Sequence, residues 1–243
     1  MRHYGLKVFT GETSDWYQEF NSYHIPTTKP QNVLLSIASS MMALYDPYRH
    51  DMVAVVGEAT GYRALQQMHR QMMNDPTGQI ILKEKPRINS KTIDFDFLRS
   101  LPDKTLGKKY ITFMDKNNIN ADTRAMTRFV DDADLAYVIQ RYRELHDFNH
   151  LLLGLQPNML GEVLVKWFEM IQTGFPVCTL GAIFGPIRLD YSKNVKLMQT
   201  YLPLVIKAAR KSTCLLNVYI EHHFEDDFEQ FRDELGIRTI PIR

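Results

Sequence analysis

Cysteine is scarce in this sequence, which has only Cys178 and Cys214 among its 243 residues. Two thiols cannot build the disulfide framework of a small secreted domain, so a reducing interior is the natural compartment. Cys178 lies in an apolar run and Cys214 lies beside another. Both positions are typical of small core residues rather than of nucleophiles.

The sequence also has no uninterrupted run of about 18 apolar residues, which excludes a predicted transmembrane helix. The formal net charge is +1 and the Lys and Arg residues are scattered, so nucleic acids and other polyanions are not expected partners. No Gly-rich phosphate loop, GxSxG elbow or dinucleotide fingerprint occurs. The first 25 residues carry Glu12, Asp15 and Glu19, unlike an acid-poor mitochondrial presequence.

Hydrophobic residues at helical spacing dominate the rest of the chain, and strand signals are weak. A content of 44% hydrophobic residues is enough for a sizeable core. The fold class predicted is all-α, a single-domain helical bundle, with an N-terminal arm at residues 1–24 and a helical domain at 25–243. Helices are expected at residues 131–154, at 192–211 with a kink or break at Pro203, and at 215–235.

A further helix is expected after Thr28, which is a candidate N-cap. Its apolar residues recur at spacings of one, three and four and so form one apolar face: Val33, Leu34, Ile37, Met41 and Leu44. The apolar run at residues 177–187 is too short to span a bilayer. It reads either as a central buried helix or as the wall of an apolar binding cavity.

One stretch combines residue types that bind metals, with His146, Asp147 and His150 in the pattern HDxxH. At ~100° per residue, these three side chains share one face of an α-helix. Gly154 and Pro157 then predict a turn and an antiparallel helical hairpin centred near Gln156.

The hairpin places Glu162 as far from the turn as His150, so a second carboxylate converges on the same point. Two imidazoles and two carboxylates suit zinc first, and also iron or manganese. The plainer alternative is a polar surface face, because HDxxH is less specific than the HExxH signature of metalloproteases.

Several stretches together resemble the mitochondrial ubiquinone (coenzyme Q) biosynthesis protein four family. They include HIPTTKPQNVLL, ALYDPYRHDMVAVVGEATG, AYVIQRYRELHDFNHLLLG, LGEVLVKWFE and LGAIFGPIRL, and they extend from His24 to Leu189. The HDxxH motif followed by eleven residues and a glutamate is the hallmark of that family. The resemblance covers nearly all of the chain.

The resemblance implies an all-helical peripheral protein on the matrix side of the inner mitochondrial membrane, within a multi-subunit complex of ubiquinone-biosynthesis proteins. It implies zinc held by His146, Asp147, His150 and Glu162. The associated activity is a lyase reaction, removal of the C1 carboxyl from 4-hydroxy-3-methoxy-5-polyprenylbenzoate, either simple or coupled to oxidation at that carbon.

Two further predictions concern the substrate. Lys166 follows Glu162 by one turn on the same face and is a candidate proton donor or carboxylate anchor, with a solvated lysine as the alternative. The small residues Gly181, Ala182 and Gly185 are expected to line an apolar cavity for the polyprenyl tail.

Two other functions compete with the lyase. The first is a non-catalytic lipid-binding scaffold that organises the ubiquinone-synthesis complex around a structural metal, because sites closed by four protein ligands are usually structural. The second is a phosphohydrolase of the His-Asp type, for which His50-Asp51 is the only additional ligand pair.

Overall fold

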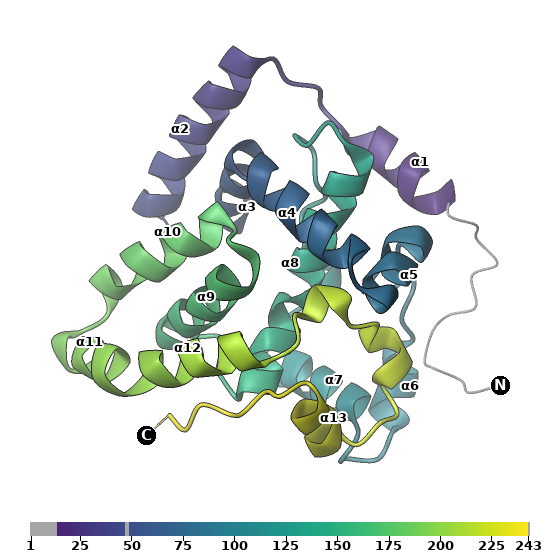
Figure 1. Cartoon of the computed structure of the whole chain (residues 1–243), viewed down its shortest axis with the longest axis vertical. Helices are drawn as coiled ribbons and strands as arrows, with labels where there is room; N and C mark the ends of the chain where they lie inside the picture. Colours follow the sequence, from purple (N-terminus) through teal and green to yellow (C-terminus); the bar gives the residue numbers. More distant parts are fainter. Residues whose placement is uncertain (1–13, 47–48, 243) are drawn as a thin grey trace.

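Helix α8 (Ala133–Leu153) runs through the centre of the structure, and most of its residues are buried (Figure 1). The computed structural model describes residues 14–46 and 49–242. Asp132 caps the start of α8 by accepting hydrogen bonds from the backbone N–H groups of Asp134 and Leu135. The helix predicted at residues 131–154 is therefore confirmed.

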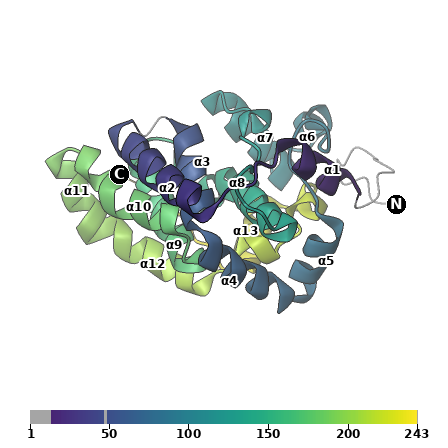
Figure 2. The same cartoon turned by 90° about the horizontal axis from the view of Figure 1, so that it is seen from above.

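Other helices surround α8 in both views (Figures 1 and 2). No strand forms in the part of the chain that the structure describes, where Thr105 and Asp227 make an isolated antiparallel bridge. The predicted all-α class is confirmed. The α-helices besides α8 are α1 (Ser14–Tyr23), α2 (Lys29–Tyr45), α3 (His50–Thr60), α4 (Tyr62–Met73), α5 (Pro76–Glu84), α6 (Phe95–Ser100), α7 (Leu106–Asn117), α9 (Met159–Thr173), α10 (Pro176–Phe184), α11 (Tyr191–Lys196), α12 (Leu202–Lys211) and α13 (Phe228–Glu234).

Short tight helices connect these elements. They are the 3₁₀ segments η1 (Ala121–Thr123), η2 (Gly185–Arg188), η4 (Leu215–Asn217) and η5 (Ile220–His223), together with a π-helical turn, η3 (Leu197–Tyr201). The prediction of one helix over residues 215–235 is wrong, because η4, η5 and loops occupy this stretch and only α13 is α-helical.

Pro203 does not break the helix predicted at residues 192–211. The π turn η3 joins α11 to α12, and the Leu202 N–H donates to the carbonyl of Leu197 five residues earlier. Proline lacks an N–H and its ring crowds the carbonyl of the preceding turn, so a wider turn accommodates it. The predicted break is therefore absent, because the helix continues through one π turn just before Pro203.

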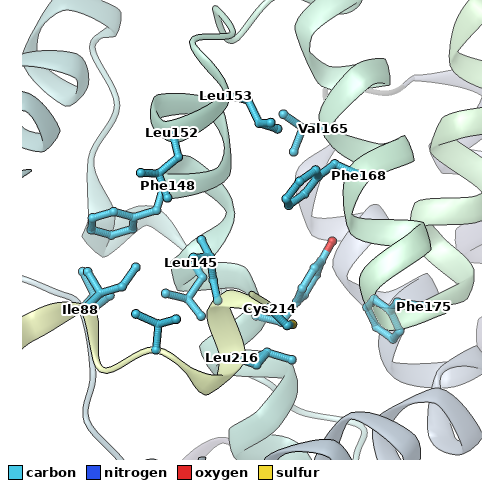
Figure 3. Packing of buried hydrophobic residues seen from close by; sticks show 14 of the residues in the cluster. Ile88, Leu145, Phe148, Leu152, Leu153, Val165, Phe168, Phe175, Cys214 and Leu216 are labelled. Atoms are coloured by element: carbon cyan, nitrogen blue, oxygen red, sulfur yellow. The ribbon is translucent and has the colours of Figure 1, made fainter. Parts of the chain in front are cut away.

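The main core lies where α8 meets α9 and the C-terminal segments (Figure 3). Phe148 and Leu152 of α8, Phe168 of α9, and Phe175 are buried at one cluster with Leu216. Helix α1 lies within the arm predicted at residues 1–24, and its Trp16 Nε1 donates to the Ala133 carbonyl at 3.0 Å. This part of the arm therefore packs against the start of α8, whereas residues 1–13 are outside the described part.

Helix α2 begins where Thr28 predicts it, with a capping box between Thr28 and Gln31. Its apolar face does not face the core. Leu34, Ile37 and Met41 are exposed, whereas Ser39 on the opposite side is buried, and α2 packs against α3. The side chain of Leu44 is outside the described part.

Candidate metal centre

The predicted hairpin between α8 and α9 is confirmed, and glycines shape its turn. Gly154 ends α8 in the left-handed region at φ 71°, where a side chain would be strained. Asn158 caps α9 by accepting a hydrogen bond from the Gly161 N–H at 3.0 Å. A Cβ at Gly161 would lie 1.9 Å from the carbonyl oxygen of Gln156, so only glycine fits there.

Three of the predicted ligands meet across this hairpin. The Nε2 atom of His146 lies 3.3 Å from one carboxylate oxygen of Glu162, and the Nε2 atom of His150 lies 3.2 Å from the other. One ligand atom from each residue falls within 4.8 Å of the others. The carboxylate therefore sits between two imidazoles, and all three side chains point to one small volume.

His150 shows why this volume suits a cation. Its side chain is only 1% exposed, and neither ring nitrogen makes a hydrogen bond of good geometry. Burial lowers the pKa of His150, so the imidazole is neutral near pH 7 and offers a lone pair. Buried nitrogens without partners are rare in folded proteins, and a metal ion bound by neutral imidazole and carboxylate would satisfy Nε2, the nitrogen that faces Glu162. The residues present fit a divalent ion.

Asp147, the fourth predicted ligand, is not in the cluster. Its buried carboxylate forms an ion pair with Arg124, from the segment between η1 and α8. The structure thus brings three of the four predicted residues together, and the role of Asp147 as a ligand stays a prediction.

A carboxylate outside the predicted set, Glu169, holds His146 in place. Glu169 is buried and accepts hydrogen bonds from His146 Nδ1 at 2.7 Å and from the Tyr142 hydroxyl at 2.6 Å. Asn149 Nδ2 donates to it at 3.2 Å. Because a carboxylate only accepts, Nδ1 carries the hydrogen and Nε2 is left to face Glu162.

Pairing of a ligand histidine with a carboxylate is a common feature of metal sites, where it fixes the orientation of the ring. The sequence did contain a signal for Glu169. Glu162, Lys166 and Glu169 follow one another at i, i+4 and i+7, so they share one face of α9. The signal alone did not distinguish Glu169 from an exposed charge.

Lys166 is part of the same buried network. Its Nζ lies 2.8 Å from Glu169 Oε2, 3.1 Å from the Tyr142 hydroxyl and 3.4 Å from His146 Nδ1. Burial lowers the pKa of Lys166, but the Glu169 carboxylate outweighs this effect and the pKa is raised. The alternative of a solvated lysine is therefore wrong, and Lys166 is a charged member of the centre.

The charges around the cluster stabilise one another. Burial and Lys166 both lower the pKa of His146, but Glu169 and Glu162 outweigh them and raise it. Burial raises the pKa of Glu162, yet the adjacent imidazoles of His146 and His150 hold it well below its usual range. A positive charge between these groups is thus favoured by the carboxylates on either side.

Helix α10 packs against α9 through the small residues that were predicted to line a cavity. A Cβ at Gly181 would lie 3.0 Å from Cγ of Lys166, and one at Gly185 would lie 2.5 Å from Cγ2 of Val163. Ala182 is 1% exposed. These contacts need small residues whether or not a lipid is near, so the tail-binding role of Gly181, Ala182 and Gly185 stays a prediction.

The run at residues 177–187 is not a central buried helix along its whole length, whereas the alternative of a cavity wall stays a prediction. Cys178 and Ala182 face inward, whereas Ile183, Phe184 and Ile187 are exposed. Burial raises the pKa of Cys178 to about 12, as expected of an inert core thiol.

Other acidic and histidine side chains outside this centre have partners elsewhere. Glu221 pairs with Arg141, and the ring of His222 stacks on Tyr219 at 3.8 Å between centroids. Asp51 pairs with Arg49 at 2.7 Å, and the side chain of His50 is outside the described part. The structure therefore adds no ligand pair for a phosphohydrolase among its described residues.

Comparison with known proteins agrees with the fold and with the family that the sequence resembles. The family described as "Coenzyme Q (ubiquinone) biosynthesis protein Coq4" matches residues 21–241. The chain is 53% identical over 220 residues to the "Ubiquinone biosynthesis protein COQ4 homolog, mitochondrial" of Bos taurus, covering 90% of this chain and 83% of that protein. It is 51% identical over 229 residues to the protein of the same name from Homo sapiens, covering 94% and 86%.

A solved structure shares the fold. It is a crystal structure from Nostoc punctiforme PCC 73102, provisionally described as a ubiquinone biosynthesis protein. The TM-score is 0.67 at 18% identity, and the match covers 84% of this chain and 97% of that one. At this identity the likeness shows the arrangement of helices alone.

Proposed function

Because the chain belongs to the coenzyme Q (ubiquinone) biosynthesis protein Coq4 family, we propose that it is a metal-dependent lyase in ubiquinone biosynthesis. The substrate is 4-hydroxy-3-methoxy-5-polyprenylbenzoate, and the reaction removes its C1 carboxyl group, with or without oxidation at that carbon. The convergence of His146, His150 and Glu162 supports this proposal most directly.

These three residues would hold zinc or another divalent ion, with Asp147 as the fourth ligand after it leaves Arg124. When bound, the ion supplies positive charge near the carboxylate or phenolic oxygen of the substrate. Glu162 and Asp147 would offset part of that charge. The centre would then suit charge stabilisation on a ring better than activation of water.

The other residues of the centre position these groups. Glu169 fixes the ring of His146 through Nδ1, and Tyr142 and Asn149 fix Glu169 in turn. Lys166 is held as an ammonium group by Glu169. This salt bridge supports a role for Lys166 as an anchor for the substrate carboxylate rather than as a proton donor.

The alternative, a lipid-binding scaffold with a structural ion, gains support from one observation. Asp147 follows His146 directly on α8, so a change of its side-chain conformation would let it complete a four-ligand set. A closed set of protein ligands is typical of structural sites. In that case other proteins of the ubiquinone-synthesis complex would act on the benzoate ring of the bound lipid.

From its membership of this family, we also propose that the protein works in mitochondria. The bovine and human relatives are both named mitochondrial. The finer expectation is peripheral contact with the matrix side of the inner membrane, alongside other ubiquinone-biosynthesis proteins. No described helix has both the length and the apolar character needed to cross a membrane.

The test is to incubate purified protein of known metal content with the prenylated methoxy-hydroxybenzoate and to follow loss of the carboxyl group. Glu162→Gln keeps the shape of the side chain but is a poorer ligand, so this variant should lose metal and turnover with a nearly unchanged melting temperature. Glu225→Gln, an exposed change elsewhere, is the matched control.

Three results separate the alternatives. Turnover by the wild type that Glu162→Gln abolishes supports the lyase. A large fall in melting temperature for Glu162→Gln, with lipid bound and no turnover by the wild type, selects the scaffold. Full metal content in Glu162→Gln would contradict the ligand assignment itself.

A further inference from the structure

Helix α2 carries its apolar side chains on the outside. Leu34, Ile37, Met41 and Tyr45 are all more than half exposed, and they recur at helical spacing along one face. The opposite side packs against α3, where Ser39 is buried and its hydroxyl donates to the Leu35 carbonyl at 2.5 Å. The amphipathic pattern of α2 is therefore turned away from the core.

A second exposed apolar group adjoins the end of α2. Ile187 of η2 and Tyr191 of α11 are 77% and 86% exposed. The guanidinium of Arg188 lies 3.4 Å from the carbonyl oxygen of Tyr45, which ties η2 to the C-terminus of α2. Figures 1 and 2 both show α2, α10 and α11 at the same end of the molecule. We call Leu34, Ile37, Met41, Tyr45, Ile187 and Tyr191 the apolar face.

Basic residues outnumber acidic ones beside the part of the apolar face that η2 and α11 contribute. Helix α2 has a single charged residue, Lys29, in 17 positions. The segment from η2 to α11, residues 185–196, carries three basic residues and one acidic residue, Asp190, which pairs with Lys193 at 3.0 Å. These basic residues, Arg188, Lys193 and Lys196, are exposed next to the apolar face.

We propose that the apolar face docks on the surface of an anionic lipid bilayer. Leu34, Ile37 and Met41 would insert among the acyl chains, as the apolar side of an interfacial helix does. The basic residues of η2 and α11 would lie at the level of the anionic headgroups. A protein partner or a second copy of the chain would have no similar need for this excess of basic charge.

The position of the face also suits access to a lipid substrate, and this part of the inference rests on the proposed function. Gly185 begins η2, which carries Ile187, and it packs directly on Val163, the residue after Glu162. The side chain of Glu162 is itself 40% exposed. A prenylated substrate would therefore leave the bilayer close to the helix that carries the metal centre.

The experiment is flotation of the full chain with phosphatidylcholine vesicles, and with phosphatidylcholine vesicles that also contain phosphatidylglycerol. The wild type should bind the anionic vesicles more tightly. The double variant Leu34→Ser/Ile37→Ser should lose roughly 10- to 100-fold in partitioning, because two inserted side chains are removed. Lys193→Gln/Lys196→Gln should lose about fivefold per charge on anionic vesicles only.

The matched control is Met73→Ser/Ile80→Ser, which replaces similarly exposed apolar residues on α4 and α5. This control should bind vesicles as the wild type does, and circular dichroism should show full helicity for every variant. Equal partitioning of Leu34→Ser/Ile37→Ser and the wild type would overturn the proposal. The proposal would also be overturned if sedimentation showed that the wild type is a dimer and that this variant is a monomer with unchanged vesicle binding.

Turnover by the wild type of a short-tailed substrate in detergent separates this proposal from the lyase. Protein that binds vesicles as expected but does not turn over this substrate contradicts the lyase and leaves docking in place. Protein that turns over the substrate but does not bind anionic vesicles contradicts docking alone.

Discussion

The centre between α8 and α9 covers charged side chains, whereas the outer side of α2 exposes apolar side chains to solvent. The centre buries Glu169 and keeps Lys166 mostly covered, with 19% of its side chain exposed, whereas α2 exposes Leu34 and Met41 to solvent. Every charged group of the centre has a partner of opposite charge, as burial requires. The outer apolar side chains of α2 are exposed instead of being covered by other described parts of the chain. They therefore contribute little to the stability of the fold and are accessible to a binding partner.

The two regions should therefore respond differently to substitution. A change at a buried charge leaves its partner unpaired in a medium that solvates charge poorly, so stability or metal binding falls. A change at an exposed apolar residue alters little that the folded chain depends on, so its effect should appear only when a partner surface is present. The following predictions test this difference, beginning with the largest effect.

The largest effect is expected at the buried ion pair between Arg141 of α8 and Glu221 of η5. Arg141 and Glu221 are both 0% exposed, and Arg141 Nη2 lies 2.8 Å from Glu221 Oε2. Glu221→Leu leaves the guanidinium without its carboxylate, which should lower the free energy of unfolding by about 3–5 kcal/mol. The melting temperature should fall by roughly 10 °C in a thermal scan.

The control for this prediction is Asp96→Asn, which breaks the exposed pair with Arg99. An exposed pair contributes at most about 1 kcal/mol, so the melting temperature should change little. If Glu221→Leu were as stable as this control, the buried pair would have no role in holding α8 to η5.

A smaller effect, on metal binding, is expected at Glu169. Glu169→Gln should weaken zinc affinity by roughly 10- to 100-fold in a calorimetric titration, because His146 loses the carboxylate that orients its ring. This variant also leaves Lys166 unpaired, so some loss of stability will accompany it. The double variant Lys166→Met/Glu169→Gln removes both charges and should recover stability while zinc affinity stays low.

The double variant decides between two roles of Glu169. Recovery of zinc affinity along with stability would mean that Glu169 serves only to neutralise Lys166. Persistent weak binding in a stable protein is the result that the orienting role requires.

The smallest effect is expected on the outer side of α2. Leu34 is 68% exposed, so Leu34→Ala should change the free energy of unfolding by less than about 0.5 kcal/mol in urea. Leu65→Ala is the matched change at a side chain that is 0% exposed, and it should cost about 2–5 kcal/mol. A large cost for Leu34→Ala in the isolated protein would show that α2 is packed more tightly than its exposure indicates.

Local sequence was sufficient for the hairpin and for most of the cluster. Gly154 and Asn158 define the turn through their own backbone conformation and capping, and the i, i+4 spacing places His146 and His150 on one face. These features depend on residues only a few positions apart. Glu162 follows once the turn is known, because the hairpin fixes which residues of its two helices face each other.

Contacts between distant residues were decided only by the tertiary structure. Arg124 reaches Asp147 from an irregular segment, and Arg141 meets Glu221 across 80 positions. Neither pair has a local pattern that could reveal it, since any charged residue of the chain was a possible partner. The prediction that Asp147 is a metal ligand did not include Arg124 as a competing partner for its carboxylate.

The direction of an amphipathic face is decided in the same way. The spacing of Leu34, Ile37 and Met41 predicts one apolar face on α2, and the structure has that face. Periodicity fixes which residues lie together on a helix, but not what lies opposite them. In the structure α2 packs against α3 and its apolar side faces outward, because only the assembled fold determines which surface of a helix is covered.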